Sequence, residues 1–573
     1  MPKSFRSFYR YIAIILSCVM LFSSIGPHFA SAAPGEANRQ STKQALTAEV
    51  GELPNKLPKA KLELTSDRTA NSTRYLNPDG SFTEEIYMEP TFYQDSTDKK
   101  WKKIDNTLKK STKKPGKYEN TANEMKSLLA NESGSGELVS VEKEGKSVAF
   151  IPAKANKVQG IVKDNEMNYK GIMPNVDIRY RVQGSSIKED IVLQQYQNEN
   201  TFSFELKVKD VTPNKEKNGT IVFKDSKGNP IWFFEKPFMT DATGNYSDKV
   251  SLDLRQENGK TFVDVIADQT FLTDPKTKYP ITIDPTIDNW NVLRDNFIAS
   301  SSPDSIYSSN TYMDTGYNSM FGTTRALARF YLPSLPSNST ITSATFNAYQ
   351  TNADGQQVSV DLYRINSDWP ASVTWNTQPT TSNTKESTVT SNAYNAYWSW
   401  DITTLARDWY NGYQANYGFM LKQQNETASP YRSFNSVNSN TNTPRLTINY
   451  RVEPIGLESF WTTTKDGVNP ANGNLVYQST DIDIPGRGSE ISLTRTFNNR
   501  KSQTKGIFGY GWFSNWEMYL SEKITGPITF VDEDSTRQIF GEKVGGGYEA
   551  PAGIYLDLVK NGDSTYTITK RTV

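Results

Sequence analysis

Apolar and polar residues alternate with a period of two along much of this chain. Residues 176–183 (VDIRYRVQ) show the pattern most regularly. The same alternation recurs at 202–208, 344–348, 358–362, 417–421 and 446–450. A period of two places every second side chain on one face of a β-strand. The pattern therefore predicts a mainly β protein.

Turn signals separate the predicted strands. Residues 77–80 (NPDG) join a proline, which fixes φ, to a glycine that accepts a positive φ. Similar signals occur at 227–230 and 258–259. The segment 108–136 is rich in lysine and weakly patterned, so we expect a long loop there.

A short helix is expected within residues 287–450, a segment that is otherwise rich in short strands and turns. Asp401 is a suitable N-cap, Leu405 and Trp409 fall on one helix face, and Gly412 suits the C-cap. Short strands with frequent turns are typical of a β-sandwich. We therefore predict a jelly-roll-like β-sandwich module with one helix.

Residues 1–32 have the three parts of a secretory signal. Basic residues precede an apolar stretch at 11–22, which is shorter than the about 20 residues of a membrane-spanning helix. Small residues then indicate cleavage between Ala32 and Ala33. A polar, proline-containing leader at 33–60 follows. We expect a secreted protein.

The chain's single cysteine and single histidine, Cys18 and His28, both lie in the predicted signal. A mature chain without them has no disulfide, thiol nucleophile, histidine base or imidazole ligand. Cys18 alternatively ends a lipoprotein box, but the apolar run continues past it. No other apolar run approaches the about 18 residues of a membrane span.

The length of the chain indicates how many domains it has, and its net charge limits the kinds of partner. The 573 residues are enough for several domains, and we place a β-rich N-terminal domain at 61–285, the sandwich module at 287–450 and a third unit at 455–573. Lys+Arg and Asp+Glu both number 63. Without a basic excess, a nucleic-acid partner is not expected. The oligomeric state is left open.

A series of motifs in the third unit resembles the start of the Rhs/YD-repeat family. The motifs are GNL from Gly473, IPGRG from Ile484, LTRTFN from Leu493 and FGYGW from Phe508. The resemblance implies a long secreted protein whose repeats form a hollow β-shell around a C-terminal toxin used in contact-dependent competition. The tyrosine-aspartate repeats are absent, so we expect 455–573 to be the first segment of a truncated shell.

Other segments resemble the N-terminal region of wall-associated Rhs proteins. They are EIYMEP from Glu85, WKKIDNTL from Trp101, KED from Lys188 and YPITIDP from Tyr279. The resemblance implies association with the cell wall. It does not assign a role to residues 61–285.

The predicted sandwich module is similar to the DNRLRE family of β-sandwich modules. The matching pieces begin at Ala328 (ARFYLPSLP), Val373 (VTWNTQP), Trp400 (WDITTLARDWYNG), Asn416 (NYGFMLK) and Pro444 (PRLTINY). Some relatives are carbohydrate-binding modules. The resemblance therefore implies a cell-wall or extracellular glycan as the partner.

Aromatic residues of the module are the candidate glycan contacts. They are Trp369, Trp375, Trp398, Trp400, Trp409 and Tyr410. Trp398 and Trp400 share one strand face and should have one environment, whereas Trp409 lies on the packed helix face. The alternative is that these rings fill the sandwich core, where large aromatics dominate packing.

No catalytic constellation is evident, so we predict a non-enzymatic binding and display region. Two carboxylates can hydrolyse glycans without histidine, but the candidates have no informative spacing: Asp304, Asp361, Asp401, Glu458 and Asp481. A polysaccharide-acting enzyme and a ligand-free structural surface protein are kept as alternatives.

No cofactor is expected from the sequence. The acidic residues 532–534 have oxygen ligands of the kind that calcium prefers. They lack the spacing of an EF-hand loop, and a solvated turn of a hairpin spanning 528–540 is the preferred interpretation. A structural calcium elsewhere cannot be assigned to residues.

Overall fold

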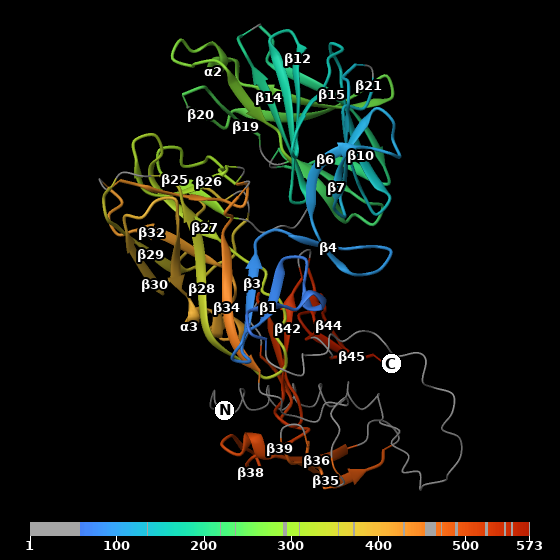
Figure 1. Ribbon diagram of the computed structural model, residues 1–573, viewed down its shortest axis with the longest axis vertical. Coiled ribbons are helices and arrows are strands. Elements are labelled where there is room, and N and C mark those ends of the chain that lie inside the picture. Colours follow the sequence, from blue (N-terminus) through green and yellow to red (C-terminus); the bar gives the residue numbers. More distant parts are fainter. Residues whose placement is uncertain are drawn as a thin grey trace, which may run out of the picture.

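The chain is mainly β and multidomain in a computed structural model (Figure 1). The model describes residues 58–571 except 135, 197, 218, 235–236, 244, 290–294, 309, 353–354, 371–372, 428–429, 440, 453–463, 465, 471–472, 487–490, 522–524, 544–545 and 552–553. The predicted signal, its cleavage site at Ala32 and Ala33, and most of the leader lie outside the described residues. Within the described residues no helix is long and apolar enough to cross a membrane.

Two sheets form the N-terminal sandwich, which comprises residues 105–289. The first has the order β21-β22-β15-β10-β9-β8-β7-β6. Its strands are β6 (Asp105–Lys110), β7 (Lys117–Ala122), β8 (Lys126–Ala130), β9 (Val139–Lys143), β10 (Lys146–Pro152), β15 (Thr201–Lys209), β21 (Val250–Glu257) and β22 (Lys260–Ala267).

The second sheet has the main order β11-β12-β13-β14-β24-β18-β17-β16, with β19, β20 and β23 joined to it. Its strands are β11 (Ile161–Lys163), β12 (Glu166–Met173), β13 (Val176–Gln183), β14 (Ser186–Leu193), β16 (Thr212–Lys215), β17 (Ile221–Lys224), β18 (Pro230–Phe234), β19 (Phe238–Thr240), β20 (Tyr246–Ser247), β23 (Ile281–Asp284) and β24 (Ile287–Asn289). A short helix, α2 (Gln269–Thr273), precedes β23. One apolar core joins both sheets.

The alternation predicted for 176–183 is confirmed, because β13 is buried at every second residue. The long loop expected at 108–136 is wrong: this segment contains the second half of β6 and all of β7 and β8. Few apolar residues mark these strands. Leu108 and Leu129 are buried, and the buried amide of Asn120 donates to the carbonyl of Met125 at 2.9 Å. Exposed lysines on the other face mask the pattern.

The module sandwich is one folded-over sheet with the main order β1-β2-β3-β34-β28-β33-β26-β27-β32-β29-β30, to which β25 and β31 pair. Its strands are β1 (Leu62–Glu63), β2 (Ser72–Leu76), β3 (Phe82–Tyr87), β25 (Asn296–Ala299), β26 (Tyr312–Asn318), β27 (Gly322–Ala328), β28 (Ser339–Gln350), β29 (Val358–Arg364), β30 (Ser387–Ser391), β31 (Ala396–Asp401), β32 (Phe419–Gln423), β33 (Arg432–Asn435) and β34 (Arg445–Val452). Rings from the two layers meet in its core, with Phe346 and Phe419 4.5 Å apart between centroids.

Residues 62–87 belong to the module sandwich and not to the N-terminal sandwich. Strand β3 pairs with β34 from Phe82↔Tyr450 to Tyr87↔Arg445, and the two lie side by side in Figure 1. Ile86 is fully buried in the module core. This pairing differs from the predicted boundaries at 61–285 and 287–450, because β3 pairs with the backbone edge of β34 and buries Ile86 in the module core.

The predicted helix is confirmed as α3 (Thr403–Tyr410). The Asp401 carboxylate accepts the backbone N–H of Thr403 at 2.9 Å, although Ile402 is the residue at the cap position itself. Leu405 and Trp409 are buried on the face against the core. The helix is eight residues long and closes one end of the sandwich.

The C-terminal segment consists of small sheets. Its strands are β35 (Val476–Ile484), β36 (Ile491–Asn498), β37 (Lys505–Gly506), β38 (Gly509–Tyr510), β39 (Trp512–Ser514), β40 (Tyr519–Ser521), β41 (Ile528–Val531), β42 (Arg537–Glu542), β43 (Tyr548–Glu549), β44 (Leu556–Lys560) and β45 (Tyr566–Lys570). The predicted hairpin is confirmed as β41–β42. The pairing of β35 with β36 has a register shift between Thr480 and Ile482.

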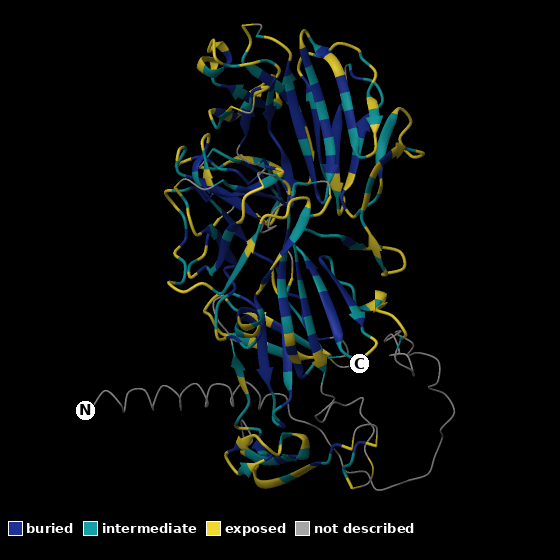
Figure 2. Ribbon diagram, turned by 60° about the vertical axis from the view of Figure 1, so that its left-hand side comes forward, coloured by how far each residue is buried: buried dark blue, intermediate teal, exposed yellow. Residues whose placement is uncertain are grey.

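Strand β42 docks on the module sandwich. The N–H of Glu542 donates to the carbonyl of Leu332 at 2.8 Å, and the N–H of Asn338 donates to the carbonyl of Arg537 at 3.1 Å. Ile539 is buried in the module core. The C-terminal segment therefore shares a core with the module sandwich. In Figure 2 the dark-blue buried residues continue from one into the other.

Four aromatic rings connect the two sandwiches. Phe238 stacks on Tyr246, Tyr246 contacts Tyr307 at 4.8 Å between centroids, and Tyr307 stacks on Phe297 at 4.4 Å. Tyr246 also donates its hydroxyl to the carbonyl of Ile306 at 2.7 Å. This packed joint holds the N-terminal sandwich against one end of the module sandwich.

Candidate functional site

Three tryptophans among the candidate glycan contacts are buried on strands and loops of the module sandwich. Trp398, Trp400 and Trp369 expose 2%, 0% and 4% of their surface, respectively. Each indole N–H is satisfied by a backbone carbonyl: those of Ala393, Val360 and Tyr417, at 2.8–2.9 Å. Such rings present no face to a ligand in this structure, and they occupy the core position that the sequence left as the alternative.

Trp398 and Trp400 do share one environment, as their spacing predicted. Both pack on Phe434 with edge-to-face geometry at 5.5 and 5.6 Å. Trp409 and Tyr410 are also buried, and Tyr410 donates its hydroxyl to the carbonyl of Pro333 at 2.9 Å. Strand and helix periodicity thus correctly predicted which of these rings share a face. The structure shows that those faces point into the core.

Trp375 is half-buried and lies on the outer face of the layer that contains β27, β32 and β29. The guanidinium of Arg325, from β27, lies 4.8 Å from the centre of the Trp375 ring. Glu426 accepts two bonds from this guanidinium, at 2.8 and 2.7 Å, and Gln378 accepts a third at 2.8 Å. A planar cation is therefore fixed against a planar ring at the surface.

A second aromatic–cation pair lies on the neighbouring strands. The ammonium of Lys422, on β32, is 4.8 Å from the centre of the Tyr363 ring, on β29. Partial burial and the nearby Arg325 lower the pKa of the Lys422 ammonium. Burial, together with the charge of Asp361, raises the pKa of the Tyr363 hydroxyl. Lys422 is half-buried and keeps one bond, donating to Thr381 at 2.8 Å.

Asp361 completes this face. It pairs across the sheet with Lys422 on one side and with Thr388 on the other. Its buried carboxylate accepts bonds from the Thr388 hydroxyl at 2.6 Å and from the Gln424 amide at 3.0 Å, and it forms an ion pair with Lys385 at 3.2 Å. We call Arg325, Asp361, Tyr363, Trp375, Lys422 and Glu426 the platform.

The strand register explains why the platform forms. Val360 and Leu362 of β29 point into the module core, so Asp361 and Tyr363 point outward. Ala326 of β27 pairs with Leu421 of β32, and both lie in the module core. Arg325 and Lys422 are their sequence neighbours, so these two side chains point outward. From the sequence, Asp361 was a candidate only as an acid, and Tyr363, Arg325 and Lys422 were not candidates. The outward positions of alternating strands were the signal that could have found them.

The platform is suited to shallow recognition of a polar ligand. It offers two partly exposed ring surfaces and, within a few side chains, both hydrogen-bond donors and acceptors. A cavity of about 90 Å³ lies elsewhere, where Arg537 of β42 meets Arg407 and Tyr410 of α3. That volume is well below the roughly 300 Å³ of a small-molecule pocket.

The carboxylates considered as catalytic candidates lie apart and have separate partners. Asp304 accepts from the Asn376 amide at 2.9 Å, Asp401 caps α3, and Asp481 pairs with Arg495. Asp361 belongs to the platform, and Glu458 lies outside the described residues. The four described carboxylates therefore do not form an acid pair.

The carboxylates of the turn at 532–534 serve the backbone of the β41–β42 hairpin. Asp532 accepts the N–H of Thr536 at 3.0 Å, and Asp534 accepts the same N–H at 2.9 Å. Among the described residues, no group of three or more histidine, cysteine, aspartate or glutamate side chains could hold a metal ion. The calcium considered from the sequence stays without an assigned site.

Two family models match this chain. Residues 287–450 match Carbohydrate-binding module family 96, and residues 465–540 match a domain of unknown function (DUF6531). The first match contains the whole platform. The second begins in the segment that carries the Rhs/YD-repeat motifs.

Curated relatives match most of the chain. The tRNA nuclease WapA of Bacillus subtilis (strain 168) is 29% identical over 78% of this chain and 21% of its own length. The tRNA(Glu)-specific nuclease WapA of Bacillus subtilis subsp. natto is 31% identical over 68% of this chain and 18% of its own length. A wall-associated protein of Geobacillus stearothermophilus is 28% identical over 31% of this chain and 75% of its own length.

The chain thus spans about a fifth of the two WapA proteins. Among solved structures, an exo-beta-1,3-galactanase from Phanerochaete chrysosporium aligns with 68% of this chain and 95% of its own at 10% identity. Its TM-score of 0.12 is too low to indicate a common fold.

Proposed function

This chain is homologous to the WapA wall-associated proteins, and on that premise we propose that it is a non-enzymatic, wall-binding region that holds a glycan on the platform. The observation that carries the proposal is the fixed Arg325–Trp375 pair inside the segment that matches a carbohydrate-binding module. Sugars present apolar C–H faces and polar edges, and the platform offers rings beside charged groups.

The mode of binding follows from the shape of the face. The platform residues come from three adjacent strands and two loops, so their spacing is set by the sheet. A rigid sheet that carries several modest contacts suits adhesion to a repeating polymer, because many such contacts act together. The proposed ligand is a cell-wall or extracellular glycan.

The wider role rests on the relatives. Two of them are named tRNA nucleases, and this chain matches about a fifth of each. We propose that this chain, which corresponds to about a fifth of each relative, attaches a longer protein to the wall outside the cell. Export would use the predicted signal. In this proposal residues 455–573 begin a YD-repeat shell, and the nuclease activity of a longer protein, delivered to competing cells, resides elsewhere.

Co-sedimentation of the whole chain with purified cell walls tests the binding proposal. We expect the wild type to sediment with walls and Trp375→Ala and Tyr363→Ala to remain largely in the supernatant. Tyr394→Ala is the matched control, because this tyrosine is 57% exposed and lies outside the platform. The whole chain is needed, since a 287–450 fragment lacks β1–β3 of its own sheet.

Three results would overturn the proposal. Equal sedimentation of the wild type and both platform variants, or no sedimentation at all, would favour a structural surface protein without this ligand site. Release of soluble glycan by the wild type, abolished by Asp361→Asn, would favour a polysaccharide-acting enzyme instead.

A further inference from the structure

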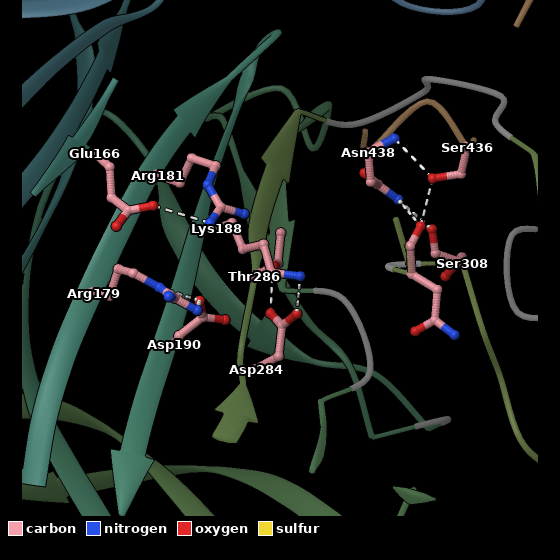
Figure 3. A network of polar contacts seen from close by, with 11 residues as sticks. Glu166, Arg179, Arg181, Lys188, Asp190, Asp284, Thr286, Ser308, Ser436 and Asn438 are labelled. Atoms are coloured by element: carbon pink, nitrogen blue, oxygen red, sulfur yellow. Dashed lines mark hydrogen bonds and ion pairs between the residues drawn. The ribbon is translucent and has the colours of Figure 1, made fainter. Parts of the chain in front are cut away.

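Lys188 and Asp284 form a buried ion pair in the N-terminal sandwich (Figure 3). The Lys188 ammonium is 2.6 Å from one carboxylate oxygen of Asp284. The side chains of the two residues expose only 16% and 2% of their surface, respectively. Thr286 donates its hydroxyl to the other carboxylate oxygen at 2.5 Å. Lys188 and Thr286 thus each hold one oxygen of the Asp284 carboxylate.

Strand pairing fixes this contact. Strand β14 pairs with β23 at Ile191↔Ile283 and with β24 at Ile187↔Ile287. Asp284 ends β23, and Lys188 lies on β14 between these two pairs. The two side chains therefore meet where the chain passes from one neighbouring strand to the next, and the sheet keeps their backbone positions close together.

The surroundings separate this pair from an ordinary surface ion pair. The Lys188 ammonium lies 5.9 Å from the centre of the Phe238 ring. Burial raises the pKa of the Asp284 carboxyl to about 6, while the charges of Asp284 and Asp190 outweigh burial and raise the pKa of the Lys188 ammonium. By contrast, Lys260 pairs with Glu205 at 2.8 Å with 56% of the lysine side chain exposed. The lysine of that second pair is far more exposed to water than Lys188.

The geometry points to an intramolecular isopeptide bond between Lys188 Nζ and Asp284 Cγ. From the ion pair, one proton passes from Nζ to the carboxylate, which leaves a neutral amine beside a neutral carboxyl group. The amine then attacks Cγ, a second proton passes from nitrogen to the departing oxygen, and the C–O bond breaks. The products are one amide bond and one water molecule, so atoms and charge balance and no oxidant is needed.

We assign the transfer of the second proton to Asp190. It lies two residues from Lys188 on the same face of β14, and its charge acts on both Lys188 and Asp284. Arg179 donates to Asp190 at 2.8 Å and keeps its carboxylate in place. Holding the Lys188 amine against the Asp284 carboxyl supplies the effective concentration that condensation needs, which reaches about 10⁵–10⁸ M in well-oriented systems.

The bond would serve a protein that has no disulfides in its β-domains. The single cysteine is Cys18, far from these strands in sequence. A Lys188–Asp284 bond would tie β14 to the segment that leads directly into the module sandwich. It would close a covalent loop of the same kind as a disulfide in an extracellular chain.

The intact mass of the purified, denatured protein tests the bond directly. We expect the wild type to be lighter by the mass of one water molecule than its own sequence requires. A proteolytic peptide that joins the segments around Lys188 and Asp284 should also be found. A wild-type protein at its full sequence mass, with the two peptides separate, is an ion pair only and overturns the inference.

Variants assign the roles. Lys188→Ala and Asp284→Ala should each have their full sequence mass, while Lys260→Ala should keep the loss of water. Asp190→Asn should form the bond much more slowly, with the circular dichroism spectrum of the wild type. Bond formation in Asp190→Asn at the wild-type rate would exclude Asp190 as the proton carrier.

Discussion

Arg325 and Glu426 are joined by two parallel bonds on the outer face of the module sandwich. Nε of Arg325 donates to one carboxylate oxygen at 2.8 Å, and a terminal nitrogen donates to the other at 2.7 Å. This fork fixes the guanidinium plane 4.8 Å from the centre of the Trp375 ring. Glu426 thus fixes the cation beside the Trp375 ring, although Glu426 does not itself stack on the ring.

Arg325→Lys is predicted to weaken glycan binding several-fold without unfolding the protein. Lysine keeps the positive charge but cannot form two parallel bonds or lie flat on the indole. Sedimentation with purified walls measures the effect, and the thermal melting curve checks the fold. Binding equal to that of the wild type would show that the planar stack is not needed.

Ile86→Ala is predicted to destabilise the module sandwich, although Ile86 lies about two hundred residues before β25, the next strand of that sandwich along the chain. Ile86 is fully buried in the module core on β3. Truncation of such a side chain costs about 2–5 kcal/mol. Urea unfolding followed by tryptophan fluorescence reports on this core. Leu62→Ala, at a side chain 42% exposed on β1, is the control and should cost far less.

Gly541→Ala is predicted to separate the C-terminal segment from the module. A Cβ at this position would lie 2.0 Å from the backbone nitrogen of Ser334 and 2.3 Å from the carbonyl carbon of Pro333. Backbone atoms cannot move aside, so β42 must shift. Limited proteolysis should then cut between the two units faster than in the wild type. Gly562→Ala, with nothing within 4 Å, should leave the rate unchanged.

Glu189→Gln is predicted to remove part of the pH dependence of stability. Burial raises the pKa of the Glu189 carboxyl from 4.5 to about 8, and Tyr180 donates its hydroxyl to this group at 2.6 Å. The folded state therefore keeps a proton that the unfolded state releases between these values. Stability from this group is complete at pH below 4.5 and is lost as pH rises toward 8.

Glutamine is neutral at every pH and can accept the same bond. Relative to the wild type, the variant should therefore gain stability steadily between pH 4.5 and 8, as measured by urea unfolding at several pH values. A difference in unfolding free energy that does not change with pH would contradict the assignment of a protonated Glu189.

Much of the fold could be predicted from local pattern. The alternation in 176–183, the helix around Leu405 and the hairpin at 528–540 all form as expected, because period and capping are properties of neighbouring residues. The pairing of β3 with β34 could not be predicted in this way, because it joins positions such as Phe82 and Tyr450 that only the completed fold brings together.

The candidate site was harder to predict for a related reason. An aromatic residue in a strand suits a core and a binding face equally well, and only the packing of the second layer decides. Trp398 and Trp400 face that layer, whereas Tyr363 faces away from it. Arg325 and Lys422 come together only through the register of β27 and β32, and this register is not evident from the sequence.

The most direct test of the central claim is the dissociation constant for soluble wall glycan, measured by titration calorimetry on the wild type, Trp375→Phe and Trp375→Ala. Truncation of an anchoring aromatic costs on the order of 2 kcal/mol, so Trp375→Ala should bind at least about tenfold more weakly. Trp375→Phe, which keeps a ring against Arg325, should lie between the two. Equal dissociation constants for all three proteins would contradict glycan binding on the platform.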